Sequence, residues 1–183
     1  MLRRLVGSEM CIRDRGNIEL ADGSNLTVDT GAAGGNITIG EIDGHSQETV
    51  TLDAGTGTTS VGVIGATTEI GALTIGSAEN GGITLNGAIT TDGIVSIDGP
   101  VTLDTAAITV TTADDAITFN HKIDGAQALT LASGSGAVTL DGATGSNTAL
   151  SALTINSAGT GTIEVNDIGT ASASGVTGLT VLG

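Results

Sequence analysis

The chain has 183 residues, of which 30 are glycine and only one, Phe119, is aromatic. Twenty acidic residues outnumber five basic ones, so the formal charge is −15. The length suits one domain, and the charge argues against nucleic acids or anionic membranes as partners, because both require basic patches. Aromatic side chains dominate burial in ordinary cores, so their near absence argues against a typical globular enzyme.

The first 15 residues differ in composition from the rest of the chain. They hold the single Cys, both Met and four of the five basic residues, namely Arg3, Arg4, Arg13 and Arg15. Residues 16–183 keep one base, Lys122, and 18 acids, a charge of −17. A secretory signal needs an apolar run of roughly 7–15 residues, which charges interrupt here. The string VGSEMCIRDR resembles a translated sequencing adapter. We therefore expect residues 1–15 to be a non-native leader, the alternative being a native amphipathic arm.

From Gly16 onward a three-residue unit, or triplet, recurs sixteen times. In each unit two aliphatic residues flank a middle residue that is usually Thr. Leu26-Thr27-Val28 is an early example and Leu179-Thr180-Val181 is the last. This alternation predicts half-buried strands with aliphatic side chains inside and Thr outside. Gly, Asp, Asn and Ser separate the triplets and predict turns. No apolar stretch approaches the ~20 residues that cross a bilayer. We therefore expect an all-β chain without a transmembrane segment.

A longer repeat relates residues 26–93 to residues 108–175. The motif Ile42-Asp43-Gly44 of the first copy aligns with Ile123-Asp124-Gly125 of the second, and small insertions fall in turns. Internal repetition of this kind indicates a stacked architecture. We expect residues 16–183 to form a single repeat-built segment that is truncated at both ends.

A right-handed parallel β-helix, or β-solenoid, suits this composition best. Its coils stack about 4.8 Å apart, so that aliphatic side chains form ladders inside a narrow tube. With about 20 residues per coil, the segment would form about eight coils. The alternative is tandem β-sandwich repeats, which normally need larger side chains to fill the layer between their sheets.

The strand units of the second copy resemble the repeats of very large bacterial surface proteins. The residues that carry this resemblance run from Ile117-Thr118-Phe119-Asn120 through Leu129-Thr130-Leu131 to Leu153-Thr154-Ile155. They are similar to filamentous-haemagglutinin-like and autotransporter-type adhesins over residues 108–175, and more loosely over residues 26–93. The resemblance implies a secreted β-helical passenger that other parts of the parent protein hold at the outer membrane.

The residues suggest no catalytic constellation. His45 and His121 are the only imidazoles, and both fall in turns beside the Ile-Asp-Gly motifs. Ser46 adjoins His45, but sequence neighbours rarely reach the geometry of a nucleophile and its base. Acidic residues are spread over almost every turn, which favours solubility over a paired-carboxylate site. We expect no catalytic, cofactor-binding or metal-binding residues.

Two special ligands, calcium and ice, come into consideration. Acidic turns supply oxygen ligands for calcium, but the stacked nonapeptide of calcium-binding repeats is absent, and the one adjacent acidic pair is Asp114-Asp115. Calcium therefore remains a minor alternative to having no cofactor. Paired Thr columns could bind ice, yet only Thr49-Val50-Thr51 and Thr109-Val110-Thr111 have that spacing. The uneven distances between successive triplets would also disturb a regular lattice.

We therefore expect a structural or passenger segment of a large extracellular bacterial repeat protein, an adhesin stalk that attaches to a host, cell or polysaccharide surface. It would carry no chemistry and would be covalently continuous with further repeats. The alternatives are a β-helical polysaccharide-acting enzyme, which needs acids or bases clustered on one face, and a segment of a phage or virion fibre, which would be a trimer. Uncapped strand edges at both ends would promote oligomerisation or aggregation.

Overall fold

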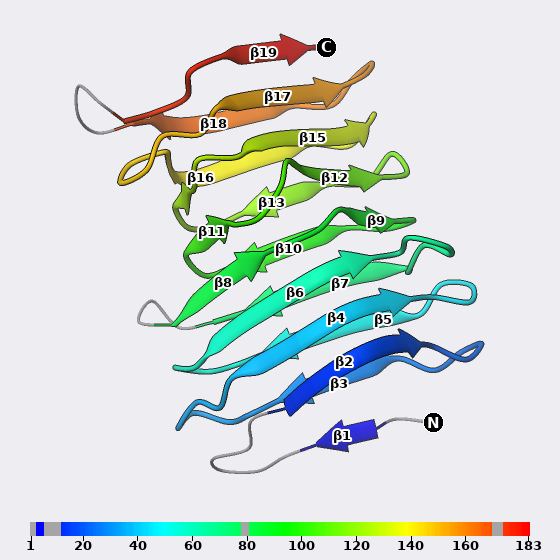
Figure 1. The fold of residues 1–183 in the computed structure, drawn as a ribbon. Helices are drawn as coiled ribbons and strands as arrows, with labels where there is room; N and C mark the ends of the chain where they lie inside the picture. Colours follow the sequence, from blue (N-terminus) through cyan, green and yellow to red (C-terminus); the bar gives the residue numbers. More distant parts are fainter. Residues whose placement is uncertain (1–2, 6–11, 78–80, 170–173) are drawn as a thin grey trace.

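The computed structural model of the chain describes residues 3–5, 12–77, 81–169 and 174–183. The fold is a parallel β-solenoid of about 7 turns, without a helix among these residues. Within these described ranges every strand pairing is parallel, and 19 strands belong to one continuous sheet that winds along the axis. Figure 1 shows the coils stacked from the N-terminal end to the C-terminal end. The expected all-β solenoid is confirmed, and tandem sandwiches are excluded.

Strand registers divide the coils into three columns along the axis, which we name A, B and C. Column A contains β1 (Arg3–Leu5), β3 (Leu26–Asp29), β5 (Thr49–Asp53), β7 (Ala72–Gly76), β10 (Val95–Asp98) and β13 (Ile117–Phe119). Column B contains β8 (Gly82–Leu85), β11 (Val101–Leu103) and β14 (Ile123–Asp124). Column C contains β9 (Ile89–Thr91), β12 (Ile108–Thr112), β15 (Ala128–Gly134), β17 (Ala152–Ser157) and β19 (Leu179–Leu182).

Longer strands bend from one column into the next. The strands β2 (Ile12–Glu19), β4 (Ile37–Asp43) and β6 (Thr58–Ile64) run from column B into column C. At the other end, β16 (Val138–Thr144) and β18 (Ile163–Ile168) run from column A into column B. The N-terminal part of the solenoid thus merges two columns and the C-terminal part merges a different pair.

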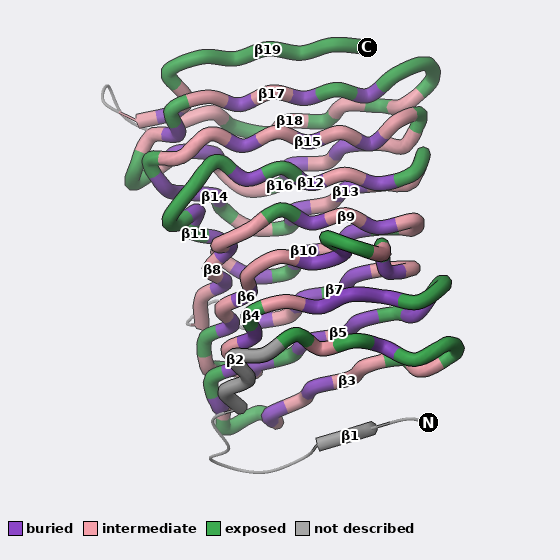
Figure 2. The backbone as a smooth tube through the Cα atoms, turned by 45° about the vertical axis from the view of Figure 1, so that its right-hand side comes forward, coloured by how far each residue is buried: buried purple, intermediate pink, exposed green. Residues whose placement is uncertain are grey.

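The core consists of ladders of aliphatic side chains, one rung per coil. In column A the second inward position holds buried side chains in register, which are Val28, Leu52, Ile75, Ile97, Phe119 and Leu140. The alternation of buried and less buried residues along strands such as β15 and β17 is visible in Figure 2, whereas β19 is exposed throughout. Because the tube is narrow, medium-sized side chains fill it, and the one aromatic residue is a single rung.

The expected coil length was too short. The shortest step between residues in register on adjacent coils runs from Ile83 to Val101, and the longest runs from Leu153 to Leu179. The solenoid therefore has about 7 turns rather than eight. The variable length lies in the corners, because the strands keep their register across them.

After the first 15 residues, two short strands carry no sequence triplet and were missed by the alternation. They are β9, in column C between β6 and β12, and β14, which has only two residues, Ile123 and Asp124. Both pair in parallel with strands of neighbouring coils, β9 with β12 and β14 with β11. Their partners, rather than their own pattern, hold them in the sheet.

The long sequence repeat does not coincide with whole turns. The triplet at Leu26 lies in column A, whereas its aligned triplet at Ile108 lies in column C. Likewise Ile42 lies in column C and its counterpart Ile123 in column B. The second copy is therefore displaced by one column around the axis, and its turns point in other directions than those of the first copy.

Glycines allow close contact where the long strands bend. A Cβ at Gly62 would overlap the carbonyl oxygen of Gly40 on the preceding coil. A Cβ at Gly142, at the bend of β16, would likewise overlap the backbone of His121. Neither position needs a positive φ, so the contact between coils, rather than backbone conformation, requires glycine there.

Candidate functional site: the two Ile-Asp-Gly corners

The first Ile-Asp-Gly corner follows β4. Asp43 is buried, and its Oδ1 accepts hydrogen bonds from the backbone N–H groups of Thr67 (2.8 Å) and Thr68 (3.4 Å) on the next coil. A hollow of about 220 Å³ lies beside it, lined also by Glu19 of the preceding coil. The carboxylate thus caps the turn above it, which otherwise leaves two backbone donors unpaired.

The second corner repeats this arrangement with more partners. Asp124 is buried, and its Oδ1 accepts hydrogen bonds from the N–H groups of Asn147 (2.7 Å) and Thr148 (3.1 Å). Its Oδ2 accepts a hydrogen bond from Asn147 Nδ2 at 3.1 Å and lies 3.7 Å from Lys122 Nζ. The ammonium group has no counterpart in the first corner, where the aligned residue is Glu41.

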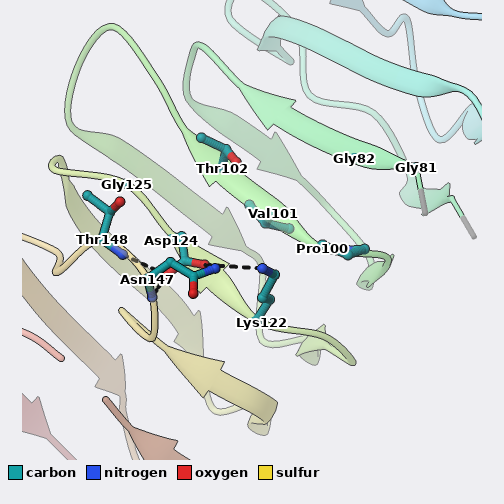
Figure 3. Close-up of a pocket in the computed structure, with 10 residues that line it drawn as sticks. All are labelled: Gly81, Gly82, Pro100, Val101, Thr102, Lys122, Asp124, Gly125, Asn147 and Thr148. Carbon is teal, nitrogen blue, oxygen red and sulfur yellow. Dashed lines mark hydrogen bonds and ion pairs between the residues drawn. The ribbon is translucent and has the colours of Figure 1, made fainter. Parts of the chain in front are cut away.

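A groove of about 370 Å³ opens at this second corner (Figure 3). It extends along column B over several coils, and its lining consists of Gly81, Gly82, Pro100, Val101, Thr102, Lys122, Asp124, Gly125, Asn147 and Thr148. Figure 3 shows Lys122, Asp124 and Asn147 turned toward one another at one end. The groove therefore offers hydroxyl, amide and ammonium groups.

A separate cluster joins Asp22, His45 and Glu48 across two coils, with one potential ligand atom of each within 4.8 Å of the others. Glu48 is the buried member, at 1% exposure, while Asp22 and His45 are exposed. From its sequence context His45 is expected to be a solvated turn residue, and that context does not place these acids beside it. This is the type of cluster that the alternative of a β-helical enzyme requires.

The hydrogen bonds of Glu48 identify a structural role within this cluster. Its Oε1 accepts hydrogen bonds from Gly23 N–H (2.9 Å) and Ser46 Oγ–H (2.9 Å), and its Oε2 accepts two from His45 N–H and Ser46 N–H, both 2.8 Å. Burial of the carboxyl group by itself would raise its pKa. The hydrogen bonds from the N–H groups of Ser46, His45 and Glu48 itself, and from Ser46 Oγ–H, outweigh this effect and lower the pKa of Glu48 from 4.5 to about 2.

Four hydrogen bonds use the approximately four lone-pair positions of a carboxylate, so Glu48 has none left for a metal ion. Asp22 and His45 alone would give a cation only two exposed protein ligands. Ser46 Oγ also donates to Asp22 Oδ1 at 2.8 Å, so it is not poised as a nucleophile toward His45. The donor set therefore fits neither a metal centre nor the Ser–His arrangement.

Two further sequence candidates remain, His121, which directly precedes Lys122 of the second corner, and Asp114. His121 Nε2 is 3.2 Å from Asp98 Oδ1 on the neighbouring coil, and the histidine is half-buried while the aspartate is exposed. Asp114 has a positive φ of 68° in its turn, and its Oδ1 accepts a hydrogen bond from Ser135 N–H at 2.8 Å. The adjacent acidic pair therefore serves the corner of the next coil, although calcium binding itself stays a minor alternative.

Outward-facing hydroxyl residues form an ordered column despite the variable triplet spacing. In column A, six residues lie in register on successive coils, namely Thr27, Thr51, Thr74, Ser96, Thr118 and Thr139. The expectation that uneven spacing disturbs the lattice was wrong, because the corners absorb the differences. The adjacent outward column contains Asp29, Asp53 and Asp98 rather than a second row of Thr.

Comparisons with known proteins add no family. No protein-family model matches the chain, and neither the curated proteins nor the solved structures gave a significant match. None of the described segments forms a helix long and apolar enough to span a membrane. The fold and the two corners therefore carry the functional argument.

Sequence reasoning missed the groove and the buried glutamate. The groove joins residues that lie far apart in the sequence, from Gly82 through Thr102 to Thr148. One signal was present, since Lys122 is the single basic residue after position 15 and lies two residues before Asp124. Nothing in the local sequence separates Glu48 from the solvated acids of the other turns.

Proposed function

We propose that the chain is a structural and presentational segment of a long extracellular bacterial repeat protein, an adhesin stalk that attaches a cell to a surface. The observation that carries the proposal is the uninterrupted stack of about 7 coils, in which turns vary while the strands stay in register. Such a stack extends the molecule and displays turns along its length.

The resemblance of residues 108–175 to adhesin repeats supports the same role. The strong negative charge keeps long copies of such a repeat apart and soluble. In this proposal the partner is a host, cell or polysaccharide surface, the location is extracellular or the bacterial outer surface, and the chain performs no chemistry of its own.

Attachment under flow tests this function. Microspheres coated with the chain are passed over epithelial cells, bacterial cells and polysaccharide-coated glass, with microspheres carrying an unrelated acidic protein as control. We expect retention of the chain-coated microspheres on at least one surface. Equal retention of both kinds of microsphere on every surface would contradict the proposal.

The enzyme alternative has one favouring observation, the Asp22–His45–Glu48 cluster. Incubation of the chain with neutral and acidic polysaccharides tests it, by measuring new reducing ends and unsaturated products. We expect neither product to form. Products that disappear in the variant His45→Ala would replace the stalk with an enzyme.

A further inference from the structure

We propose that the groove at Asp124 binds an extended, neutral oligosaccharide that lies along the solenoid axis. This inference rests on the proposed function and names the chemistry of the surface to which the stalk attaches. The two proposals can nevertheless be tested separately, because the groove is a local binding site, whereas the stalk function belongs to the whole chain.

The shape of the groove selects an extended ligand. Its lining takes residues from β8, β11 and β14 and from the turn at Asn147 on the coil above. Adjacent coils are about 4.8 Å apart, so a site that spans four coils is on the order of 14 Å long. A single ion would leave most of this length empty, whereas a chain of two or three sugar rings would fill it.

A short corner creates the hollow. Only Gly99 and Pro100 connect β10 to β11, and the step from Ile83 to Val101 is the shortest between adjacent coils of the described chain. Gly99 is buried, and a Cβ there would press against Ser77 and Ile83. The corner therefore stays close to the core.

The groups that face the groove suit hydroxyl ligands. Thr102 and Asn147 are exposed, and the Lys122 side chain is 45% exposed while its ammonium group stays 3.7 Å from Asp124. Together these hydroxyl, amide and ammonium groups can both donate and accept hydrogen bonds, as the hydroxyls of a sugar do. The lining has no aromatic side chain, so apolar and aromatic ligands find no platform.

Charge selects a neutral saccharide over an acidic one. The chain carries a net charge of −15, and Asp124 lies beside the only cation of the groove. This charge would repel a uronic or sialic acid polymer at distances within ~8 Å, because physiological salt screens charges that are further apart. Because the groove lacks an aromatic platform, we expect a dissociation constant in the millimolar range. Repeated weak sites along a stalk would raise the overall affinity through avidity.

The first corner supports the assignment as an internal comparison. It is hollowed at the equivalent Asp43, yet Glu19 replaces Thr102 below the carboxylate and Glu41 takes the place of Lys122. That hollow is smaller, 220 against 370 Å³, and its lining has two carboxylates and no ammonium group. We therefore expect the saccharide to bind at the second corner and to leave the first unoccupied.

Titration with linear neutral hexasaccharides, cellohexaose and maltohexaose, tests the proposal by amide chemical-shift changes in nuclear magnetic resonance spectra. We expect one of them to shift Thr102, Lys122 and Thr148 and to leave Thr67 and Thr68 unchanged. Asn147→Ala and Thr102→Val should each weaken binding at least about tenfold. Asn166→Ala is the matched control, because that exposed amide also donates to a neighbouring coil, at Asp141 O (2.8 Å), but lies outside the groove.

Three results would overturn the groove assignment. They are no shifts at about 10 mM of either sugar, shifts that persist unchanged in both Asn147→Ala and Thr102→Val, and tighter binding of hexagalacturonate than of the neutral probes. Folding of each variant is verified from its own amide spectrum. Microsphere attachment is measured separately, so loss of attachment with intact saccharide binding would reject the stalk function and leave the groove assigned.

Discussion

The two Ile-Asp-Gly corners place the same motif in different surroundings. At both, a buried aspartate accepts two backbone N–H groups from the turn of the next coil. After the first motif the chain continues through His45 and Ser46 to the buried Glu48. After the second motif it continues through Ala126 to Gln127, and Lys122 directly precedes this motif. The motif thus fixes the contact between coils, while the residues around it decide whether the hollow beside the aspartate is small, as at Asp43, or larger, as at Asp124.

The largest expected effect concerns the part that both copies share, the glycine at the strand bend. Gly62→Ala and Gly142→Ala should each lower the free energy of unfolding by about 3 kcal/mol or more, because the added methyl group meets backbone of the preceding coil. Gly82→Ala, where a Cβ meets open space, is the control. Denaturant unfolding measures all three, and an effect in only one copy would break the equivalence of the bends.

The next effect separates the corners. Glu48→Gln should cost about 2 to 3 kcal/mol, because an amide NH₂ then faces N–H donors that the carboxylate satisfied. The exposed Glu164→Gln is its control. A loss equal to that of the control would show that the four hydrogen bonds of Glu48 do not stabilise the first corner.

The same residue predicts an acid response. The pKa of Glu48 is about 2 in the folded chain and 4.5 as its ordinary value, so its contribution is fully present above pH 4.5 and is lost as the pH falls toward 2. Urea unfolding between pH 6 and pH 2.5 should therefore show a steeper loss of stability for the native chain than for Glu48→Gln. Parallel curves would contradict the lowered pKa.

A smaller gain is expected inside the ladder of column B. Thr59 and Thr144 occupy inward rungs, and among the described residues their buried hydroxyls have no hydrogen-bond partner. Replacing either with Val should stabilise the chain by about 1 kcal/mol, because a methyl group takes the place of an unpaired hydroxyl. Thr102→Val, on the outward side, should be neutral in stability, and a loss at Thr59 or Thr144 would indicate a partner for the hydroxyl.

The smallest effect concerns the cation of the second corner. Lys122→Met should change the free energy of unfolding by about 0.5 kcal/mol or less, because the ion pair with Asp124 is long and its lysine half-exposed. Added salt should abolish even this difference. A loss above about 1.5 kcal/mol would mean that Lys122 stabilises its corner as Glu48 stabilises the first, and that its ammonium group is not free for a ligand.

Of the sixteen predicted strand triplets, the structure places fifteen within strands and the one at Ile18 at the end of β2. The triplets succeeded because alternation of aliphatic residues with Thr is a local signal that suits a half-buried strand. The triplet pattern missed β9 and β14, because pairing with strands on other coils holds these two strands in the sheet. The candidate site was largely out of reach, because Thr102, Asp124 and Asn147 become neighbours only when coils of unequal length stack.

The sequence by itself determined the strand composition, the direction in which Thr and aliphatic side chains face, and the glycine- and aspartate-rich corners. These features depend on residues two or three positions apart, whose energetics are local. Only the tertiary structure decided the register between coils, since it depends on corner lengths that differ between the short step at Ile83 and the long step at Leu153. The three columns, the displacement of the second copy and the groove at Asp124 all follow from that register.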